Sequence, residues 1–360
     1  MTAIAETTPR PSFAILVAIS AIGPLALNLM IPSMPGLEKT FGVPYGTVQL
    51  TLTLYLIGMA VCQLIYGPAS DRFGRRPLLL AGLSLFFVAS LLAAIAPTIE
   101  LLIAARLVQA IAMVRDVFTR EKSASVISYI TMAFVVAPMV APVLGGALEY
   151  YSDWRSGFWL LAALGAIVLI AAWVTLPETH TTRNTDQQNF FSNAGKLFAL
   201  PRFRHYTFTL GFTSAVFFAF LGGAPHIMID ILKRTPLEYG VWFACISLGY
   251  MVGNFLSGFY TQKFGIDRMI MAGCVITVLG GFLCLASAIS GQLSPATLFL
   301  PMALAAFGNG LTIPNGTAGA ISVDSRMTGA AAGWSGFAQM AMGSAASQLV
   351  GSLQTAHPFA

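Results

Sequence analysis

The stretch Gly67-Pro-Ala-Ser-Asp-Arg-Phe-Gly-Arg-Arg-Pro77 holds four charged side chains between two runs that hold none, 40–70 and 77–99. Each run can supply the roughly 20 apolar residues that a helix needs to cross the hydrocarbon core of a bilayer. The loop is rich in arginine, which favours the cytoplasmic side of a membrane. Two apolar helices joined by a short basic turn are typical of a polytopic helical membrane protein.

The composition of the whole chain supports the same class. Only 9% of the 360 residues are charged, against about 25% in a typical soluble domain. The apolar share is 56%, and a soluble protein of this size cannot hide so much apolar surface. The four cysteines all lie in apolar runs, which excludes a secreted disulfide scaffold. The net charge of +5 does not make the chain a nucleic-acid binder.

Charge-free runs of spanning length recur along the chain, and one segment breaks their pattern. Between Glu100 and Arg115 lie only 14 residues, with Arg106 among them. A helix of that length reaches about 21 Å, whereas the hydrocarbon core is about 30 Å thick. The pattern predicts an all-α protein with about 11 spans, in which the fourth span is short and the twelfth is absent.

The basic residues predict the orientation of these spans. With a cytoplasmic N-terminus and a crossing at the short segment, 14 of the 19 Lys and Arg residues fall inside, 4 fall outside, and Arg106 lies within a span. Without that short crossing, inside and outside would be exchanged from residue 115 onward.

The longest polar segment divides the chain into two expected halves. We expect an N-terminal half of six helices at 1–177, a cytoplasmic linker at 178–206, and a C-terminal half of five helices at 207–360. At an offset of 191 residues, Phe73-Gly74 matches Phe264-Gly265 and several further positions agree. Six spans lie between the two copies, so the repeat keeps its orientation, as the parallel repeats of transporters do.

The basic loop at 67–77 carries a recognisable motif. The orientation rule explains its arginines but not Asp71, because acidic residues contribute little to orientation. The pattern G-x-x-x-D-R-F-G-R-R resembles the signature loop between spans two and three of the major facilitator superfamily. The resemblance implies two six-helix halves and a cytoplasmic gate. It assigns the gate to Gly67, Asp71, Arg72, Gly74, Arg75 and Arg76.

Two further motifs resemble the same family. An arginine within a span is a candidate functional residue by default, because its charge is costly in the bilayer. Arg106 and Gln109 match the fourth-span pattern R-x-x-Q-G, although the small-residue stretch that follows it in the family is missing here. The segment 137–146 resembles the antiporter motif of drug exporters, which assigns a role to Pro138, Pro142, Gly145 and Gly146. A bent packing helix explains this segment equally well.

The first span, which contains the stretch 24–35, carries Asn28 as an uncharged polar group deep within it. Together with Asp116-Val-Phe118 and the stretch 153–159, it resembles the bicyclomycin-resistance (Bcr/CflA-type) branch of drug:proton antiporters. Many members have an aspartate at the position of Asn28. An asparagine cannot titrate, so this chain departs from the family at a residue suited to carrying the proton.

The remaining candidates lie in the C-terminal half. His226 and Asp230 stand four residues apart near the outer end of the seventh span, where they can pair along a helix. They are candidates for proton coupling, and an interfacial role is the alternative. A substrate cavity is expected to use Phe217, Phe220, Trp334 and Gln339, although aromatic residues at helical spacing more often serve packing.

The resulting hypothesis is a secondary transporter that exports drugs or other amphiphilic xenobiotics across the bacterial inner membrane, by proton antiport and alternating access. A sugar or metabolite transporter of the same superfamily and a non-transporting receptor or scaffold are the alternatives. No P-loop, zinc motif or nucleophile elbow occurs, so we expect no enzymatic activity, no cofactor and no metal. The expected partners are a small-molecule substrate, protons and lipid, without nucleic acid, and the expected state is a monomer.

Overall fold

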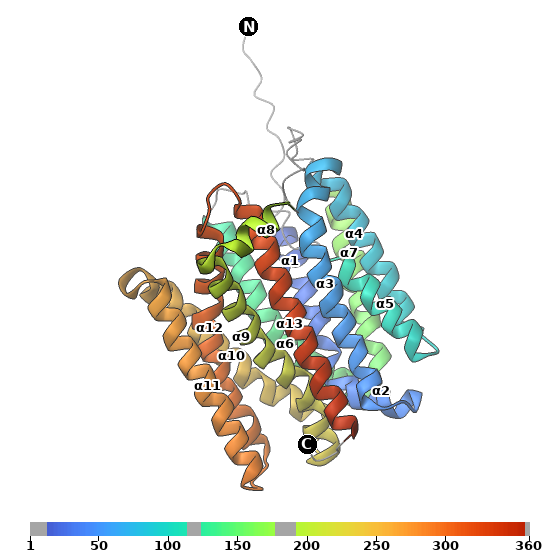
Figure 1. The fold of residues 1–360 in the computed structure, drawn as a ribbon. Helices are drawn as coiled ribbons and strands as arrows, with labels where there is room; N and C mark the ends of the chain where they lie inside the picture. Colours follow the sequence, from blue (N-terminus) through green and yellow to red (C-terminus); the bar gives the residue numbers. More distant parts are fainter. Residues whose placement is uncertain (1–12, 114–123, 177–191, 357–360) are drawn as a thin grey trace.

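The computed structural model describes residues 13–113, 124–176 and 192–356, and this part of the chain is almost entirely helical. Figure 1 shows the helices side by side in one bundle. They are α1 (Phe13–Leu29), α2 (Met34–Phe41), α3 (Tyr45–Phe73), α4 (Arg75–Ala94), α5 (Ile99–Ile111), α6 (Ala124–Tyr151), α7 (Trp154–Thr175), α8 (Ser192–Ala199), α9 (Pro201–His226), α10 (Pro236–Phe264), α11 (Ile266–Ile289), α12 (Pro295–Ser322) and α13 (Thr328–Ala356). A 3₁₀ turn (Ile31–Ser33) precedes α2, and a π-helical turn (Ile227–Ile231) follows α9.

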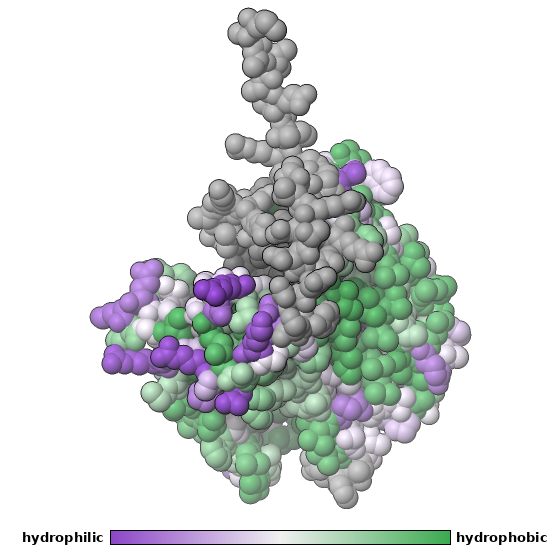
Figure 2. All heavy atoms as spheres, turned by 45° about the horizontal axis from the view of Figure 1, so that its top comes forward, coloured by the Kyte–Doolittle hydropathy of each residue, from purple (hydrophilic) through white to green (hydrophobic). Residues whose placement is uncertain are grey.

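Eight of the described helical segments are long and apolar enough to cross a membrane, judged by length and composition. The flanks of the bundle expose large apolar side chains such as Trp173, Phe259 and Phe282. Figure 2 shows apolar flanks, with hydrophilic residues gathered toward the end of the bundle seen in front. In water such a surface would associate or aggregate, so these flanks fit a lipid environment. The all-α membrane fold predicted by the sequence is confirmed.

The short fourth segment is a helix of only 13 residues, α5. Thr98 caps its first turn, because the Thr98 side chain accepts a hydrogen bond from the backbone N–H of Leu101. The expected short helix between Glu100 and Arg115 is therefore present. Residues 114–123, which follow it and contain the Asp116 motif, lie outside the described residues.

The two copies of the sequence repeat share one unusual backbone conformation. Gly74, between α3 and α4, has φ 86° and ψ 156°, and Gly265, between α10 and α11, has φ 85° and ψ 159°. Only glycine, which has no Cβ, adopts a positive φ of this kind at little cost in conformational energy. The predicted match of Phe73-Gly74 with Phe264-Gly265 therefore corresponds to the same sharp turn in both places, and α3 and α10 each contain 29 residues.

The helices before and after the undescribed segment 177–191 meet most extensively along two pairs, α3 with α13 and α6 with α10. We call α1–α7 the N-terminal helices and α8–α13 the C-terminal helices. The second pair approaches closely because it is lined with glycine. A Cβ on Gly146 would collide with the carbonyl oxygen of Pro236, and a Cβ on Gly240 would collide with that of Pro142. Of the expected linker 178–206, the described part holds α8 and the start of α9.

Candidate functional site

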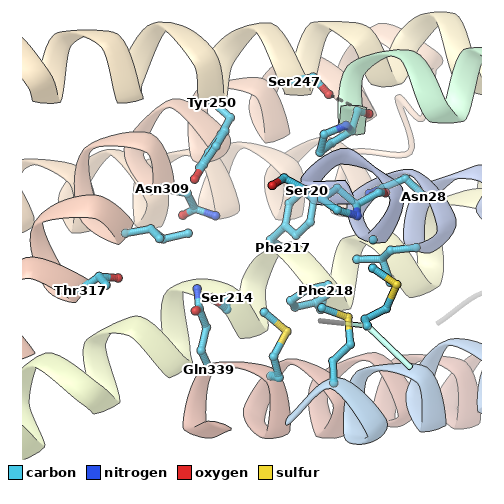
Figure 3. Close-up of a pocket in the computed structure, with 18 of the residues that line it drawn as sticks. Ser20, Asn28, Ser214, Phe217, Phe218, Ser247, Tyr250, Asn309, Thr317 and Gln339 are labelled. Carbon is cyan, nitrogen blue, oxygen red and sulfur yellow. Dashed lines mark hydrogen bonds between the residues drawn. The ribbon is translucent and has the colours of Figure 1, made fainter. Parts of the chain in front are cut away.

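A cavity of about 560 Å³ lies between the N-terminal and the C-terminal helices. Its wall takes residues from both groups, namely from α1, α3 and α6 on one side and from α9, α10, α12 and α13 on the other. Pockets of about 300–1,000 Å³ commonly hold small molecules. Figure 3 shows its side chains converging from several of these helices.

The described wall of this cavity carries no charged side chain. Much of it is aromatic or sulfur-containing, with the sulfur supplied by Met59, Met113, Met340 and Cys62. Phe217 packs edge-on against Phe218, with ring centroids 5.4 Å apart. Methionine adapts its shape to irregular apolar ligands and aromatic rings add flat apolar surface. The wall therefore suits a neutral or amphiphilic molecule.

Several of the polar side chains in the wall are already hydrogen-bonded to the protein, whereas Gln63 Nε2 in the same wall has no partner among the described residues. Asn309 donates to the carbonyl of Thr213 over 3.4 Å and accepts from the Thr277 hydroxyl over 3.1 Å. Ser20 donates to the carbonyl of Leu16 over 2.9 Å. These side chains reach the cavity from α12 and α1 (Figure 3). They place neutral dipoles in the wall without adding charge.

Asn28 is held on this wall by its own helix. Its amide nitrogen donates to the carbonyl of Pro24 over 2.8 Å, and only 2% of the residue is exposed. The side-chain oxygen of Asn28 has no hydrogen-bond partner among the described residues. Asn28, singled out in the sequence, therefore belongs to the residues that line the cavity, while its side-chain oxygen is buried in the wall.

Arg106 lies behind the cavity wall, fully buried. Its Nη1 donates to the carbonyl of Ala26 over 3.1 Å and to Gln109 Oε1 over 2.6 Å, and Gln109 in turn donates to Ser90 Oγ over 2.8 Å. The guanidinium stacks 4.0 Å from the ring centroid of Tyr55. Arg106 thus ties the short α5 to α1, the helix that carries Asn28, and Gln109 ties α5 to α4.

A charged cluster joins the two helix groups at the end of the bundle that carries α2. Lys39 Nζ lies 3.0 Å from Asp230 Oδ1, and His226 Nδ1 lies 3.2 Å from Asp230 Oδ2. Ligand atoms of Glu38, His226 and Asp230 all lie within 4.8 Å of one another. His226 also packs on Tyr45, with ring centroids 5.0 Å apart. The predicted pair His226 and Asp230 therefore belongs to an inter-helix cluster, separate from the cavity.

Hydrogen bonds continue this closure from α3 to α9 and α13. Tyr45 donates to the carbonyl of Gly222 over 2.8 Å, and Gln49 donates to the Ser347 hydroxyl. Deeper in the bundle, Thr53 donates to Gln348 Oε1 over 2.7 Å. The α2 end of the bundle is therefore held shut by direct contacts between the N-terminal and the C-terminal helices.

The loop motif is only partly described. The structure describes the backbone here, but not the side chains of Asp71, Arg72 and Arg75 or the surroundings of Gly67, so the gate that the motif implies stays a prediction. Gly74 provides the sharp turn already noted, and Arg76 Nη2 donates to the carbonyl of Trp173 over 3.0 Å. That bond connects the loop to α7.

The antiporter-like segment of α6 serves both packing and the cavity. Pro138 lines the cavity, and its carbonyl accepts a hydrogen bond from Ser247 of α10 over 3.3 Å. A Cβ on Gly145 would collide with the carbonyl oxygen of Leu29, so Gly145 lets α6 lie against α1. Pro142 and Gly146 give α6 the close approach to α10 described above.

The cavity gathers some of the expected residues and leaves others aside. Phe217 and Gln339 line it, as Figure 3 shows. Phe220 instead packs on Phe299, and Trp334 packs on Phe198. Neither belongs to the described lining.

Several lining residues were not singled out from the sequence, among them Asn309, Ser247 and Tyr250. The sequence did contain a signal for two other lining residues. Gln63 and Asn254 occupy matching positions at the 191-residue offset of the repeat, and both line the cavity.

With this geometry established, comparison with known proteins identifies the family. The family model of the Major Facilitator Superfamily matches residues 16–347. The chain therefore belongs to this superfamily of membrane transporters. It is a multi-pass membrane protein of the transporter class, which is the class that the bundle and its central cavity define.

Individual relatives agree with this assignment. The chain is 30% identical to the "Uncharacterized MFS-type transporter YdgK" of Bacillus subtilis, over 96% of this chain and 90% of the relative. It is 29% identical to "Multidrug resistance protein D" of Escherichia coli, over 85% and 79%. It is 27% identical to the "Bicyclomycin resistance protein homolog" of Haemophilus influenzae, over 93% and 87%. The predicted likeness to bicyclomycin-resistance proteins is thereby confirmed.

Solved structures share the fold. An inward-facing, unoccupied bacterial homolog of the lysosomal transporter Spinster aligns with a TM-score of 0.72 at 17% identity, covering 96% of this chain and 82% of that one. A partially occluded, inward-open xylose transporter XylE from Escherichia coli aligns with a TM-score of 0.72 at 12% identity, covering 95% and 90%. At these identities the likeness concerns the fold alone.

Proposed function

We propose that this protein exports small amphiphilic compounds, including drugs, across the bacterial inner membrane. The observation that carries the proposal is the cavity between the two helix groups, whose described wall is aromatic, methionine-rich and uncharged. Such a wall binds ligands by burying their apolar surface and by matching their shape. It offers no countercharge to an ionised metabolite. The names of two relatives, which refer to multidrug and bicyclomycin resistance, support the same substrate class.

We propose that the protein works by alternating access, with the α2 end facing outward. The distribution of basic residues favours this orientation and a cytoplasmic N-terminus. The contacts from Lys39–Asp230 to Thr53–Gln348 would then be the closed outer gate. When the outer end is closed, substrate enters the cavity from the cytoplasmic side. This is the state in which an exporter binds its substrate.

Protons are the proposed driving ion. The described cavity wall has no group that titrates near neutral pH, so we place the proposed proton site among the other described residues. Among the described residues, the cluster of Glu38, His226 and Asp230 joins both helix groups and contains titratable side chains. Because Lys39 and Tyr45 pack against the same cluster, its charge is linked to the closure of the outer gate.

Flux in vesicles tests this proposal. Purified protein is reconstituted, inside-out vesicles are selected, and uptake of an uncharged lipophilic dye is followed after a proton gradient is imposed. We expect gradient-driven accumulation that an uncoupler collapses to the level of protein-free vesicles. Equal dye levels with and without the uncoupler would refute proton coupling. Flux of a sugar without flux of the dye would overturn the proposed substrate class.

A further inference from the structure

We propose that Glu38, His226 and Asp230 form a binding site for a zinc ion, and that the bound ion holds the α2 end of the bundle shut. The ion acts as an external ligand that inhibits opening, and it is not a resident cofactor. The inference goes beyond the proposed function, which assigns no metal ion to this cluster. Because binding needs neither a proton gradient nor a transported substrate, it is tested separately from export.

The three side chains supply the donor atoms that zinc prefers. Their ligand atoms all lie within 4.8 Å of one another. Zinc is bound by imidazole nitrogen and by carboxylate oxygen, whereas Mg²⁺ and Ca²⁺ prefer oxygen ligands alone. His226 and Asp230 stand four residues apart, across the end of α9 and the π-helical turn that follows it. This is the spacing at which a helix presents two zinc ligands on one face.

Two of these atoms face each other without a hydrogen bond. His226 Nδ1 lies 3.2 Å from Asp230 Oδ2, yet both atoms are buried and neither has a hydrogen-bond partner among the described residues. Buried polar atoms are almost always satisfied. Neighbouring ligands of a tetrahedral zinc ion lie about 3.4 Å apart, since each is about 2.1 Å from the metal. A zinc ion bound to both atoms therefore satisfies them near the separation observed.

The third ligand comes from the other group of helices. Glu38 lies in α2, among the N-terminal helices, and His226 ends α9, among the C-terminal helices. Glu38 is only partly buried, so rotation of its side chain can shorten the remaining distance to a bound ion. An ion held by all three side chains links α2 to α9. Opening of this end of the bundle then has to break a bond between metal and ligand.

Lys39 is a competitor for the same carboxylate. Its Nζ lies 3.0 Å from Asp230 Oδ1, on the oxygen that does not face His226, and 67% of the Lys39 side chain is exposed. The ammonium group repels a second cation nearby, but its exposed side chain can swing into water when zinc binds. Removing the charge of Lys39 should therefore weaken the native ion pair and tighten zinc binding. A cluster that serves only as an ion pair has no reason to show the second effect.

Zinc binding to the full chain tests the inference. The protein is purified without a polyhistidine tag and held in lipid nanodiscs, and bound metal is measured by equilibrium dialysis near neutral pH. The probe is zinc chloride, with magnesium chloride as the comparison and empty nanodiscs as the blank. We expect saturable zinc binding by the wild type and no magnesium binding at the same concentrations.

Variants then assign the zinc to the cluster. His226→Gln removes the imidazole and is expected to weaken zinc binding at least about tenfold, because the loss of an outer-shell partner alone costs about 10–100-fold. His205→Gln is the matched control, since His205 is an exposed histidine in the same helix, and it should leave zinc binding unchanged. Lys39→Gln is expected to tighten zinc binding several-fold. Zinc held by the four free cysteines is common to all these proteins and does not alter the comparison.

A labelling experiment asks whether the bound ion holds the α2 end shut. Phe217, which lines the cavity, is replaced by cysteine in an otherwise cysteine-free chain. A membrane-impermeant maleimide is added outside intact cells, with and without zinc chloride. We expect zinc to slow the labelling several-fold, and we expect His226→Gln in the same chain to remove this effect.

The outcomes separate the inference from the proposed function. A wild type that binds no zinc above the blank overturns the inference, even if no variant folds. Equal zinc affinity in folded His226→Gln and the wild type overturns it as well. Zinc binding with an unchanged labelling rate refutes the effect on opening. A wild type that binds zinc in the cluster but shows no dye flux supports the metal site and refutes the proposed export function.

Discussion

Arg106 shows how one buried charge is accommodated at the scale of a residue. It has no carboxylate partner among the described residues and relies on Gln109, the Ala26 carbonyl and the Tyr55 ring. The sequence pointed to Arg106 because an intramembrane arginine is costly, and to Gln109 because the two residues resemble the family's fourth-span pattern. It could not predict Ala26 or Tyr55, since these lie on other helices.

Replacing Arg106 should therefore loosen α5 from α1. Arg106→Ala removes a charge-assisted hydrogen bond to Ala26 and leaves Gln109 Oε1 without its donor, although Gln109 still donates to Ser90. We expect a loss of about 2–3 kcal/mol in the free energy of unfolding. The loss is measured as a lower melting temperature of the purified protein. Arg268→Ala, at an exposed arginine, is the control, and an equal fall in both variants would contradict a specific role for Arg106.

At the scale of helices, glycine decides how closely α6 and α10 approach. A Cβ at Gly146 would collide with the backbone at Pro236, whereas a Cβ at Gly281 in α11 would meet no atom within 4 Å. Gly146→Ala should cost about 1–3 kcal/mol through overpacking. Gly281→Ala should be neutral or stabilising, by up to about 1 kcal/mol, because alanine favours helix. Thermal melts of the two variants should diverge, and parallel behaviour would count against the close approach.

The charged cluster at the α2 end makes a separate prediction about the outer gate. If Lys39–Asp230 helps to hold that end shut, Asp230→Asn should open it more often. A single cysteine placed at Phe217, in an otherwise cysteine-free chain, reports this opening. We expect a membrane-impermeant maleimide, added outside intact cells, to react several-fold faster in Asp230→Asn.

Lys233→Gln is the control for this experiment, because it neutralises an exposed lysine near the same end. It should leave the labelling rate at the wild-type value. Equal rates in Asp230→Asn and the wild type would show that the ion pair does not contribute to closure.

At the scale of the whole molecule, the sequence predicted much of the architecture from two simple signals. The spacing of charged residues predicted an all-α membrane protein and the short α5. The repeat predicted that Gly74 and Gly265 share a turn, which they do with φ of 86° and 85°. Both signals are local, because they depend on runs and motifs along the chain.

The cavity was harder to predict, because it depends on how distant helices meet. Phe217 and Phe220 are only three residues apart, yet Phe217 lines the cavity and Phe220 packs on Phe299. Aromatic spacing alone cannot separate these faces of α9. The closure at the α2 end includes the hydrogen bond between Thr53 and Gln348, which are nearly 300 positions apart. No local sequence pattern around either residue predicts this contact.

The most direct test of transport by alternating access is dye flux with the outer gate locked. Thr53→Cys and Gln348→Cys are combined in a cysteine-free chain, since the two side chains meet across the helix groups at 2.7 Å. Dye uptake is then measured in inside-out vesicles before and after a short thiosulfonate cross-linker, and again after reduction. Cross-linking should stop dye uptake and reduction should restore it, while either single-cysteine variant should be unaffected. Undiminished uptake by the fully cross-linked protein would show that transport does not require this end of the bundle to open.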